Sequence, residues 1–150
     1  ISVADQGRMA AVFAPLDEIE RIVSAVDGYV VIANINSDKQ AVIGGATKPV
    51  EAAIEAFVNA GYNVVPLSVS HAFHTSIVAP ASGPLREMLS RVHLQAPCVP
   101  VVANVDGEFY PTGSSAGRQM VDILARQVAS PVQFVKGLHT LYENGARVFI

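Results

Sequence analysis

Two histidines three residues apart, His71 and His74, are the side chains whose type and spacing could do chemistry. On one face of a helix, such a pair could bind a metal ion. No aspartate or glutamate that could serve as a third ligand follows within the next ten residues, so we expect no metal site. The alternative is that either histidine simply packs, which is the commoner role of a single histidine.

The position of His74 favours a role as a general base. It directly precedes a predicted helix that Thr75 or Ser76 can cap. The partial positive charge at a helix N-terminus disfavours imidazolium, so the ring would tend to stay neutral and able to accept a proton. The same position would also suit a histidine that packs on the start of the helix. His93 and His139 are isolated in the sequence, and we expect them to be solvated or packed.

The first half of the chain must position these histidines, and its hydrophobic pattern alternates between strands and helices. β-Branched and apolar runs predict strands, and apolar residues at helical spacing predict helices. The expected strands cover residues 9–14, 29–35, 40–44 and 63–69, with helices over residues 16–26 and from a Thr47 cap to Gly61. The order β-α-β-β-α-β is the ferredoxin-like pattern, which by itself indicates no function.

The second half is expected to add helices and two more strands. A helix predicted over residues 76–92 contains Pro80 and Pro84, which must either lie in its early part or break it into two pieces. Further helices are expected over residues 117–128 and 132–144, and strands over residues 99–103 and 147–150. Cys98 lies in the apolar run that contains the first of these strands, so we expect it to be a small core residue.

Composition limits the classes of function. Hydrophobic residues make up 51% of the 150 residues and charged residues 15%, so burial must drive folding. No apolar run reaches the roughly 18 residues of a membrane span, so we expect no membrane partner. The net charge of −3 without a basic cluster argues against nucleic acid as a partner. A single cysteine excludes an internal disulfide and favours the reducing cytoplasm.

A collinear series of motifs runs along the chain, and the most specific is His71-Ala72-Phe73-His74 within residues 69–75. The others cover residues 7–12, 33–36, 40–45, 100–107 and 124–134. Together they resemble the C-terminal part of the acyltransferase domains of modular polyketide synthases and of the related malonyl-CoA:acyl-carrier-protein transacylases. The resemblance covers essentially the whole chain, and the form of the histidine motif leans toward a synthase.

The resemblance implies ping-pong acyl transfer with no tightly bound cofactor. In this family a serine in a Gly-x-Ser-x-Gly turn attacks malonyl-CoA, and a histidine activates that serine and later the phosphopantetheine thiol of an acyl carrier protein. His74 matches that histidine, and Gln127 matches the glutamine whose backbone carbonyl orients the imidazole. His71 and Phe73 match residues that accompany malonyl rather than methylmalonyl selection, and Phe73 would fill the space of an α-methyl group.

The resemblance also implies a division of the chain and a missing half. Residues 8–69 would form a ferredoxin-like small subdomain, and residues 70–150 the C-terminal part of an α/β-hydrolase-like large subdomain. The family's nucleophilic serine elbow and oxyanion loop would precede this chain. The arginine that binds the malonyl carboxylate would precede it too, because Arg8 matches a different position of the motif. We therefore expect both ends to be cut, and the piece alone to expose core surface and to be unstable and inactive.

The whole protein is thus expected to be an acyltransferase that moves malonyl groups in polyketide or fatty acid synthesis. Its partners would be malonyl-CoA, an acyl carrier protein and, in a synthase, neighbouring domains. The alternative is a catalytically silent acyltransferase-like docking or scaffold domain, which the residue at the centre of the upstream serine turn would distinguish. A freestanding ligand-binding module built on the ferredoxin-like half is a further alternative, against which the paired histidines argue.

Overall fold

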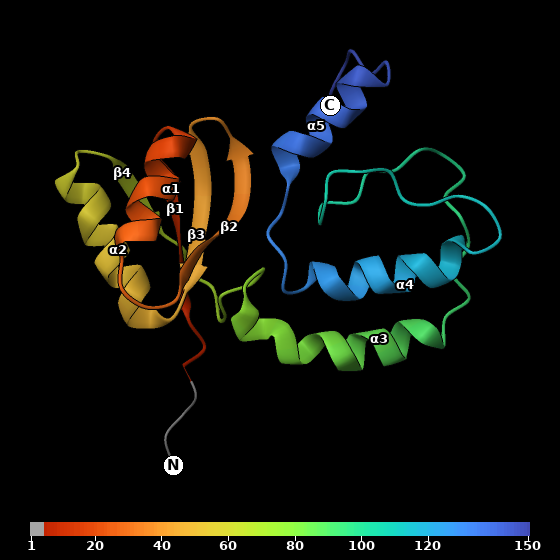
Figure 1. Cartoon of the computed structure of the whole chain (residues 1–150), viewed down its shortest axis with the longest axis horizontal. Coiled ribbons are helices and arrows are strands. Elements are labelled where there is room, and N and C mark those ends of the chain that lie inside the picture. Colours follow the sequence, from red (N-terminus) through yellow and green to blue (C-terminus); the bar gives the residue numbers. More distant parts are fainter. Residues whose placement is uncertain (1–4) are drawn as a thin grey trace.

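The computed structural model of the protein describes residues 5–150. It joins a small antiparallel sheet, covered by two helices, to a second half built mostly from helices and loops (Figure 1). The first half contains β1 (Arg8–Phe13), α1 (Leu16–Ala25), β2 (Val30–Ser37), β3 (Gln40–Gly45), α2 (Thr47–Asn59) and β4 (Asn63–Pro66). This order of elements is the one that the sequence predicts, although β4 is shorter than expected.

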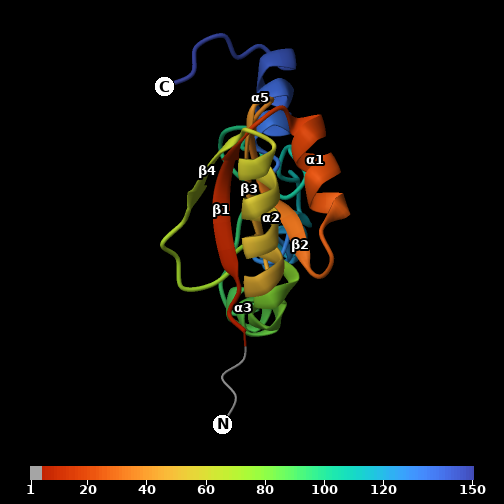
Figure 2. The same cartoon turned by 90° about the vertical axis from the view of Figure 1, so that its left-hand side faces the viewer.

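The strands lie in the order β2-β3-β1-β4, and every neighbouring pair is antiparallel. α1 and α2 cover one face of this sheet (Figure 2). Their apolar stripes pack on the strands to make the main core, whose fully buried members include Val12, Ile19, Ile43, Val50 and Phe57. Burying a side chain of this size stabilises the fold by about 1.5–3 kcal/mol.

The other face of the sheet carries residues 70–75, which we call the histidine loop. Ala72 of this loop is buried in a second, smaller core. The sheet residues of this core are Met9, Ala11, Ala33 and Val42. Successive side chains of a strand point to opposite faces, so β1 is buried on both sides because helices cover one face and the histidine loop the other. The histidine loop therefore packs on this face of the sheet.

The second half contains the 3-10 helix η1 (Ser76–Ala81) and the α-helices α3 (Ser82–Ser90), α4 (Ala116–Gln127) and α5 (Phe134–Glu143). The helix predicted over residues 76–92 is therefore formed as a 3-10 helix that contains Pro80, followed directly by an α-helix with Pro84 in its first turn. α3 and α4 run antiparallel and pack against each other (Figure 1). Val132 joins this half to β2, since its N–H donates to the carbonyl of Ala33 over 2.8 Å and its carbonyl accepts from Ile35 over 3.0 Å.

The two strands expected in the second half, residues 99–103 and 147–150, are not formed. In the first segment a single antiparallel bridge joins Val102 to Phe109, and the second segment has no regular structure. A strand is stable only when its backbone groups pair with a neighbouring strand. The first segment pairs only with residues 108–110, through two backbone hydrogen bonds of 2.8 Å, and within residues 5–150 no strand pairs with the second. Cys98, expected in the core beside the first strand, is exposed for the same reason.

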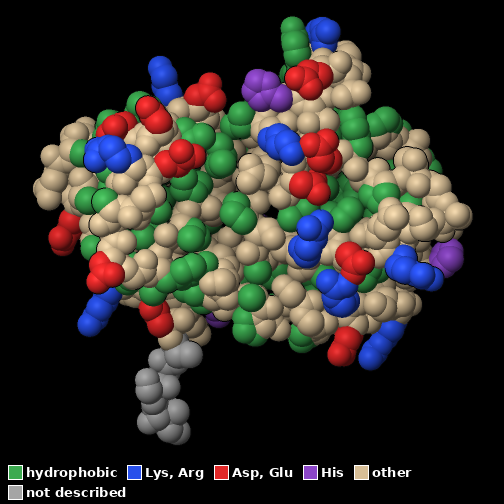
Figure 3. Space-filling model, in the orientation of Figure 1, with side chains coloured by type: hydrophobic (Ala, Val, Ile, Leu, Met, Phe, Trp, Pro, Cys, Tyr) green, Lys and Arg blue, Asp and Glu red, His purple; other side chains and the backbone are tan. Residues whose placement is uncertain are grey.

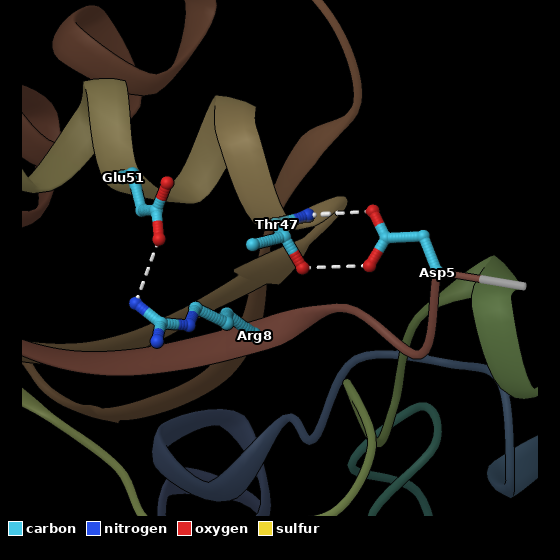
Figure 4. Close-up of polar contacts among 4 residues, drawn as sticks. All are labelled: Asp5, Arg8, Thr47 and Glu51. Atoms are coloured by element: carbon cyan, nitrogen blue, oxygen red, sulfur yellow. Dashed lines mark hydrogen bonds and ion pairs between the residues drawn. The ribbon is translucent and has the colours of Figure 1, made fainter. Parts of the chain in front are cut away.

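The start of α2 also differs from the prediction. Thr47 does not cap this helix; it is the first helical residue, and its side chain makes no cap bond. The carboxylate of Asp5 accepts hydrogen bonds from the N–H and the hydroxyl of Thr47, at 2.8 and 2.6 Å (Figure 4). The first N–H groups of a helix have no partner within it, so a carboxylate at this end is favourable.

The surface carries charges of both signs. On the face shown in Figure 3, lysine and arginine side chains are interspersed with aspartate and glutamate and form no continuous basic patch. Exposed pairs such as Lys136 and Glu108, 2.8 Å apart, contribute little to stability. Within residues 5–150, no helix combines the length and the apolarity that a membrane crossing needs.

Candidate active site

His74 closes the histidine loop in a left-handed backbone conformation, with φ at 60°, and is the one non-glycine residue among residues 5–150 with a positive φ. This conformation costs about 1–3 kcal/mol and persists only where surrounding contacts impose it. The N–H of His74 donates to the carbonyl of Val128 over 3.2 Å. Thr75 is buried; its hydroxyl donates to the carbonyl of Ala72 over 2.6 Å and caps η1 by accepting from Ile77. Such strain clusters at functional sites.

The imidazole of His74 meets the end of α4. Its Nδ1 atom lies 3.2 Å from the backbone carbonyl oxygen of Gln127, the last residue of that helix. The final carbonyls of an α-helix lack the usual partner four residues ahead, and this oxygen accepts from the N–H of Ser130 over 3.4 Å. A carbonyl oxygen has two lone pairs, so it can also accept from Nδ1–H. That bond fixes the tautomer with the proton on Nδ1 and leaves Nε2 able to take up another proton. The structure thus brings together His74 and Gln127, the two residues to which the family resemblance gives catalytic roles.

An apolar hollow of about 260 Å³ opens beside the imidazole. Leu85 and Leu89 of α3 form one part of its lining, and Leu124 and Val128 form another. His74 and Gln127 are the polar residues of its lining. The hollow is open to solvent, so its apolar side chains supply one wall of a site beside the imidazole and do not enclose it.

His71 and Phe73 form a second pair, separate from His74. Their ring centroids lie 6.1 Å apart with the planes tilted by 50°, and Nδ1 of His71 is 3.1 Å from the hydroxyl of Ser70. Neither residue lines the hollow beside His74. Phe73 is 45% exposed, so it is not packed under the loop and is free to contact a bound molecule. Their assignment to substrate selection stays a prediction.

The remaining histidines take no part in this site. His93 and His139 are both exposed. Within residues 5–150, no group of three histidine, cysteine, aspartate or glutamate residues is placed to hold a metal ion. His71 and His74 also do not share a helical face, because both lie in the loop before η1.

Sequence reasoning missed a Gly-x-Ser-x-Gly pattern, which the chain does contain at residues 113–117 with Ser115 at its centre. Ser115 is exposed and directly precedes α4, whereas Gln127 and the imidazole of His74 lie at the opposite end of that helix. A helix of 12 residues spans about 18 Å, so Ser115 cannot deliver a proton to His74. No strand leads into the pattern either, as a nucleophile elbow requires. Ser115 is therefore not placed to act as a nucleophile with His74 as its base.

A half-buried imidazole fixed by a backbone carbonyl could serve as the base of a nucleophile–base pair, and the histidine loop that carries it packs on one face of the small antiparallel sheet. A sequence profile described as "Acyl transferase domain" matches residues 1–150. The chain belongs to the acyl transferase domain family.

Individual relatives agree with this assignment. The chain is 31% identical over 152 residues to the malonyl CoA-acyl carrier protein transacylase of Bacillus subtilis, covering 98% of this chain and 47% of the relative. It is 32% identical over 147 residues to a polyunsaturated fatty acid synthase of Thraustochytrium sp., covering 97% of this chain and 5% of that protein. The crystal structure of the acyl-carrier-protein S-malonyltransferase of Burkholderia pseudomallei superimposes with a TM-score of 0.87 at 33% identity, covering 97% and 47% of the two chains. The chain thus spans about half the length of the discrete transacylases that it matches.

Proposed function

We propose that this chain is the histidine-bearing part of a malonyl transferase. The complete domain would move a malonyl group from malonyl-CoA, through an acyl-serine, to the phosphopantetheine thiol of an acyl carrier protein in polyketide or fatty acid synthesis. The observation that carries the proposal is the contact of 3.2 Å between Nδ1 of His74 and the carbonyl oxygen of Gln127. The name of the Bacillus subtilis transacylase supports the malonyl group and the carrier protein as substrates, and the name of the Thraustochytrium synthase supports a role in fatty acid synthesis.

The proposed chemistry needs His74 twice. In the first half-reaction, Nε2 takes the proton of the serine hydroxyl while the serine oxygen attacks the thioester carbon. The imidazolium then returns that proton to the departing CoA sulfur. In the second, Nε2 takes the proton of the phosphopantetheine thiol, the sulfur attacks the malonyl-serine ester, and the proton passes back to the serine oxygen. Gln127 holds the ring in place throughout, because its carbonyl keeps the proton on Nδ1.

The groups that this chemistry still needs belong to the other half of the domain. The proposal places the serine, the oxyanion donors and the arginine for the malonyl carboxylate there, since the chain spans 47% of the Bacillus subtilis relative. Residues 8–69 would be the ferredoxin-like subdomain, which the strand order β2-β3-β1-β4 supports, and residues 70–150 would complete the large hydrolase-like subdomain. A cytoplasmic location and neighbouring synthase domains as partners belong to the same proposal.

Selection of malonyl over methylmalonyl is assigned to His71 and Phe73. Phe73 projects a half-exposed ring from the histidine loop, one residue from His74. A ring at this place can exclude the α-methyl group of a bulkier acyl donor. Discrimination over one methyl group amounts to about 1–3 kcal/mol, so the preference would be graded rather than absolute.

The proposal is tested by intact-protein mass spectrometry on a polypeptide that contains both halves of the domain. Incubation with malonyl-CoA should add one malonyl group, and a phosphopantetheine-bearing carrier protein should then remove it. The 150-residue chain alone is the control and should stay unmodified. Binding of malonyl-CoA without an adduct on the longer polypeptide would favour a silent scaffold domain. An adduct on the short chain would contradict the assignment of the nucleophile to the other half, and Ser115→Ala would then locate it.

A further inference from the structure

Two hydrogen bonds reach the histidine loop and its continuation from the side of the small sheet, one on each side of His74. The carbonyl of Gln6 accepts from the N–H of Ala72 over 2.9 Å, two residues before His74. The hydroxyl of Tyr29 accepts from the N–H of Ser76 over 2.7 Å, two residues after His74. The short segment that carries the left-handed residue is therefore fixed at both ends by residues far away in sequence.

Asp5 fixes the first of these contacts. Its Oδ1 atom accepts from the N–H of Gly7 over 2.9 Å and from the hydroxyl of Thr47 over 2.6 Å, and its Oδ2 atom accepts from the N–H of Thr47 over 2.8 Å (Figure 4). The carboxylate therefore closes a tight turn over Gln6 and fastens it to the first residue of α2. Charged acceptors make stronger hydrogen bonds than neutral ones, so the three hydrogen bonds to the Asp5 carboxylate stabilise this turn although they lie at the surface.

Tyr29 fixes the second contact. It lies directly before β2, and its own backbone carbonyl accepts from the N–H of Ala46 over 2.8 Å. The backbone of Gly45 passes so close to this carbonyl that a β-carbon at Gly45 would collide with it. The backbone of Tyr29 is thus held against the start of α2, and its half-buried side chain extends from there to Ser76.

We infer that Asp5 and Tyr29 are positioning residues that together hold the left-handed backbone of His74 and keep its imidazole against Gln127. The inference rests on the proposed function of His74. A residue with φ at 60° relaxes toward negative φ when the contacts around it loosen. Such a change would turn the imidazole away from the helix end. The loss should appear in kcat rather than in KM, because neither Asp5 nor Tyr29 lines the hollow beside His74.

The test compares Tyr29→Phe and Asp5→Asn in a polypeptide that contains both halves of the domain. Each change has a matched control: Tyr62→Phe removes a hydroxyl that contacts Glu18 at 3.4 Å, and Glu51→Gln breaks the ion pair with Arg8 beside Asp5 (Figure 4). We expect each positioning variant to lower the kcat of malonyl transfer about tenfold with KM unchanged. The controls should change kcat less than about twofold.

Amide hydrogen exchange supplies a readout that does not depend on activity. Exchange at Ser76 should become faster in Tyr29→Phe, and exchange at Ala72 faster in Asp5→Asn, with no change at either amide in the controls. Equal kcat in variants and controls, or a similar fall in all of them, would overturn the inference. If the unaltered polypeptide does not transfer malonyl, the proposed function fails, and unchanged exchange at Ala72 and Ser76 would then overturn the anchoring as well.

Discussion

Nδ1 of His74 lies 3.2 Å from the backbone carbonyl oxygen of Gln127, a residue 53 positions further along the chain. The contact exists because the histidine loop and the C-terminal end of α4 meet at this place. The histidine loop lies on the sheet through Ala72, and the last carbonyl groups of α4, which lack helical partners four residues ahead, lie beside it. A backbone acceptor cannot be removed by substitution, so the orientation of the imidazole depends on the fold itself.

Gly7 tests how tightly the histidine loop is packed on the chain that enters β1. Its φ is 76°, and an added β-carbon would collide with the carbonyl of Gly45 and lie 2.7 Å from side-chain atoms of Ala72 and Ile77. Gly7→Ala should therefore lower the free energy of unfolding by about 3 kcal/mol. Gly61 has a similar φ of 85°, but an added β-carbon there would meet no atom within 4 Å. Gly61→Ala should therefore lower the free energy of unfolding by only about 1 kcal/mol. Denaturant unfolding measures the free energy of unfolding of both variants. Equal decreases would show that the histidine loop can shift to accommodate a β-carbon at Gly7.

Phe73 gives a prediction about the acyl donor. Phe73→Ser removes a ring that is 45% exposed and should leave the fold intact. The ratio of kcat/KM for methylmalonyl-CoA to that for malonyl-CoA should rise by about 10-fold or more, because space for an α-methyl group is created. His139→Gln, an exposed change on α5, serves as the control and should leave this ratio unchanged. An unaltered ratio in Phe73→Ser would show that selection is made elsewhere.

The carboxylate of Asp5 predicts a dependence on pH. Hydrogen bonds from the hydroxyl and N–H of Thr47, and from the N–H of Gly7, lower the pKa of Asp5 below its ordinary value of 3.8. A carboxyl whose folded pKa is lowered adds stability above its unfolded pKa and loses it as the pH falls through the folded value. The difference in unfolding free energy between the unaltered protein and Asp5→Asn should thus be constant near pH 7 and shrink below about pH 4. A difference that grew in acid would contradict the assignment.

The exposed apolar segments predict the behaviour of the chain by itself. Val99 is 66% exposed and Val148 is 81% exposed, in the two segments that the sequence assigns to strands. Apolar surface of this kind marks a place where another part of a protein binds. The 150-residue chain alone should therefore bind a hydrophobic dye and melt without cooperativity, and addition of the other half of the domain should suppress both effects. Cooperative melting of the isolated chain without dye binding would contradict this.

The sequence predicts most accurately the helices and strands that short-range patterns of residues determine. The elements of the first half follow from the alternation of apolar residues, and the change from 3-10 to α-helix between η1 and α3 accompanies Pro80 and Pro84. The segments 99–103 and 147–150 have the composition of strands, but a strand forms only beside a partner. Their composition therefore indicates where a strand could form and not whether its partner is present.

Long-range contacts of the candidate site could not be predicted from spacing. Nothing in the sequence links Asp5 to Thr47 or Tyr29 to Ser76, because each pair is brought together only by the completed sheet. The Gly-x-Ser-x-Gly pattern around Ser115, which the sequence reasoning overlooked, shows that such a motif can be present without the strand and turn that would make it an elbow. Only the resemblance to a family paired His74 with Gln127.

The rate of malonyl adduct formation on a polypeptide with both halves of the domain tests the central claim most directly, when the unaltered protein is compared with His74→Asn. Asparagine tolerates a left-handed backbone, so this change should keep the loop at φ near 60° while removing the proton acceptor. Stopped reactions with malonyl-CoA, read by intact mass, should show acylation slowed at least about 100-fold in the variant. Acylation at the same rate in both proteins would contradict the role of His74 as the base.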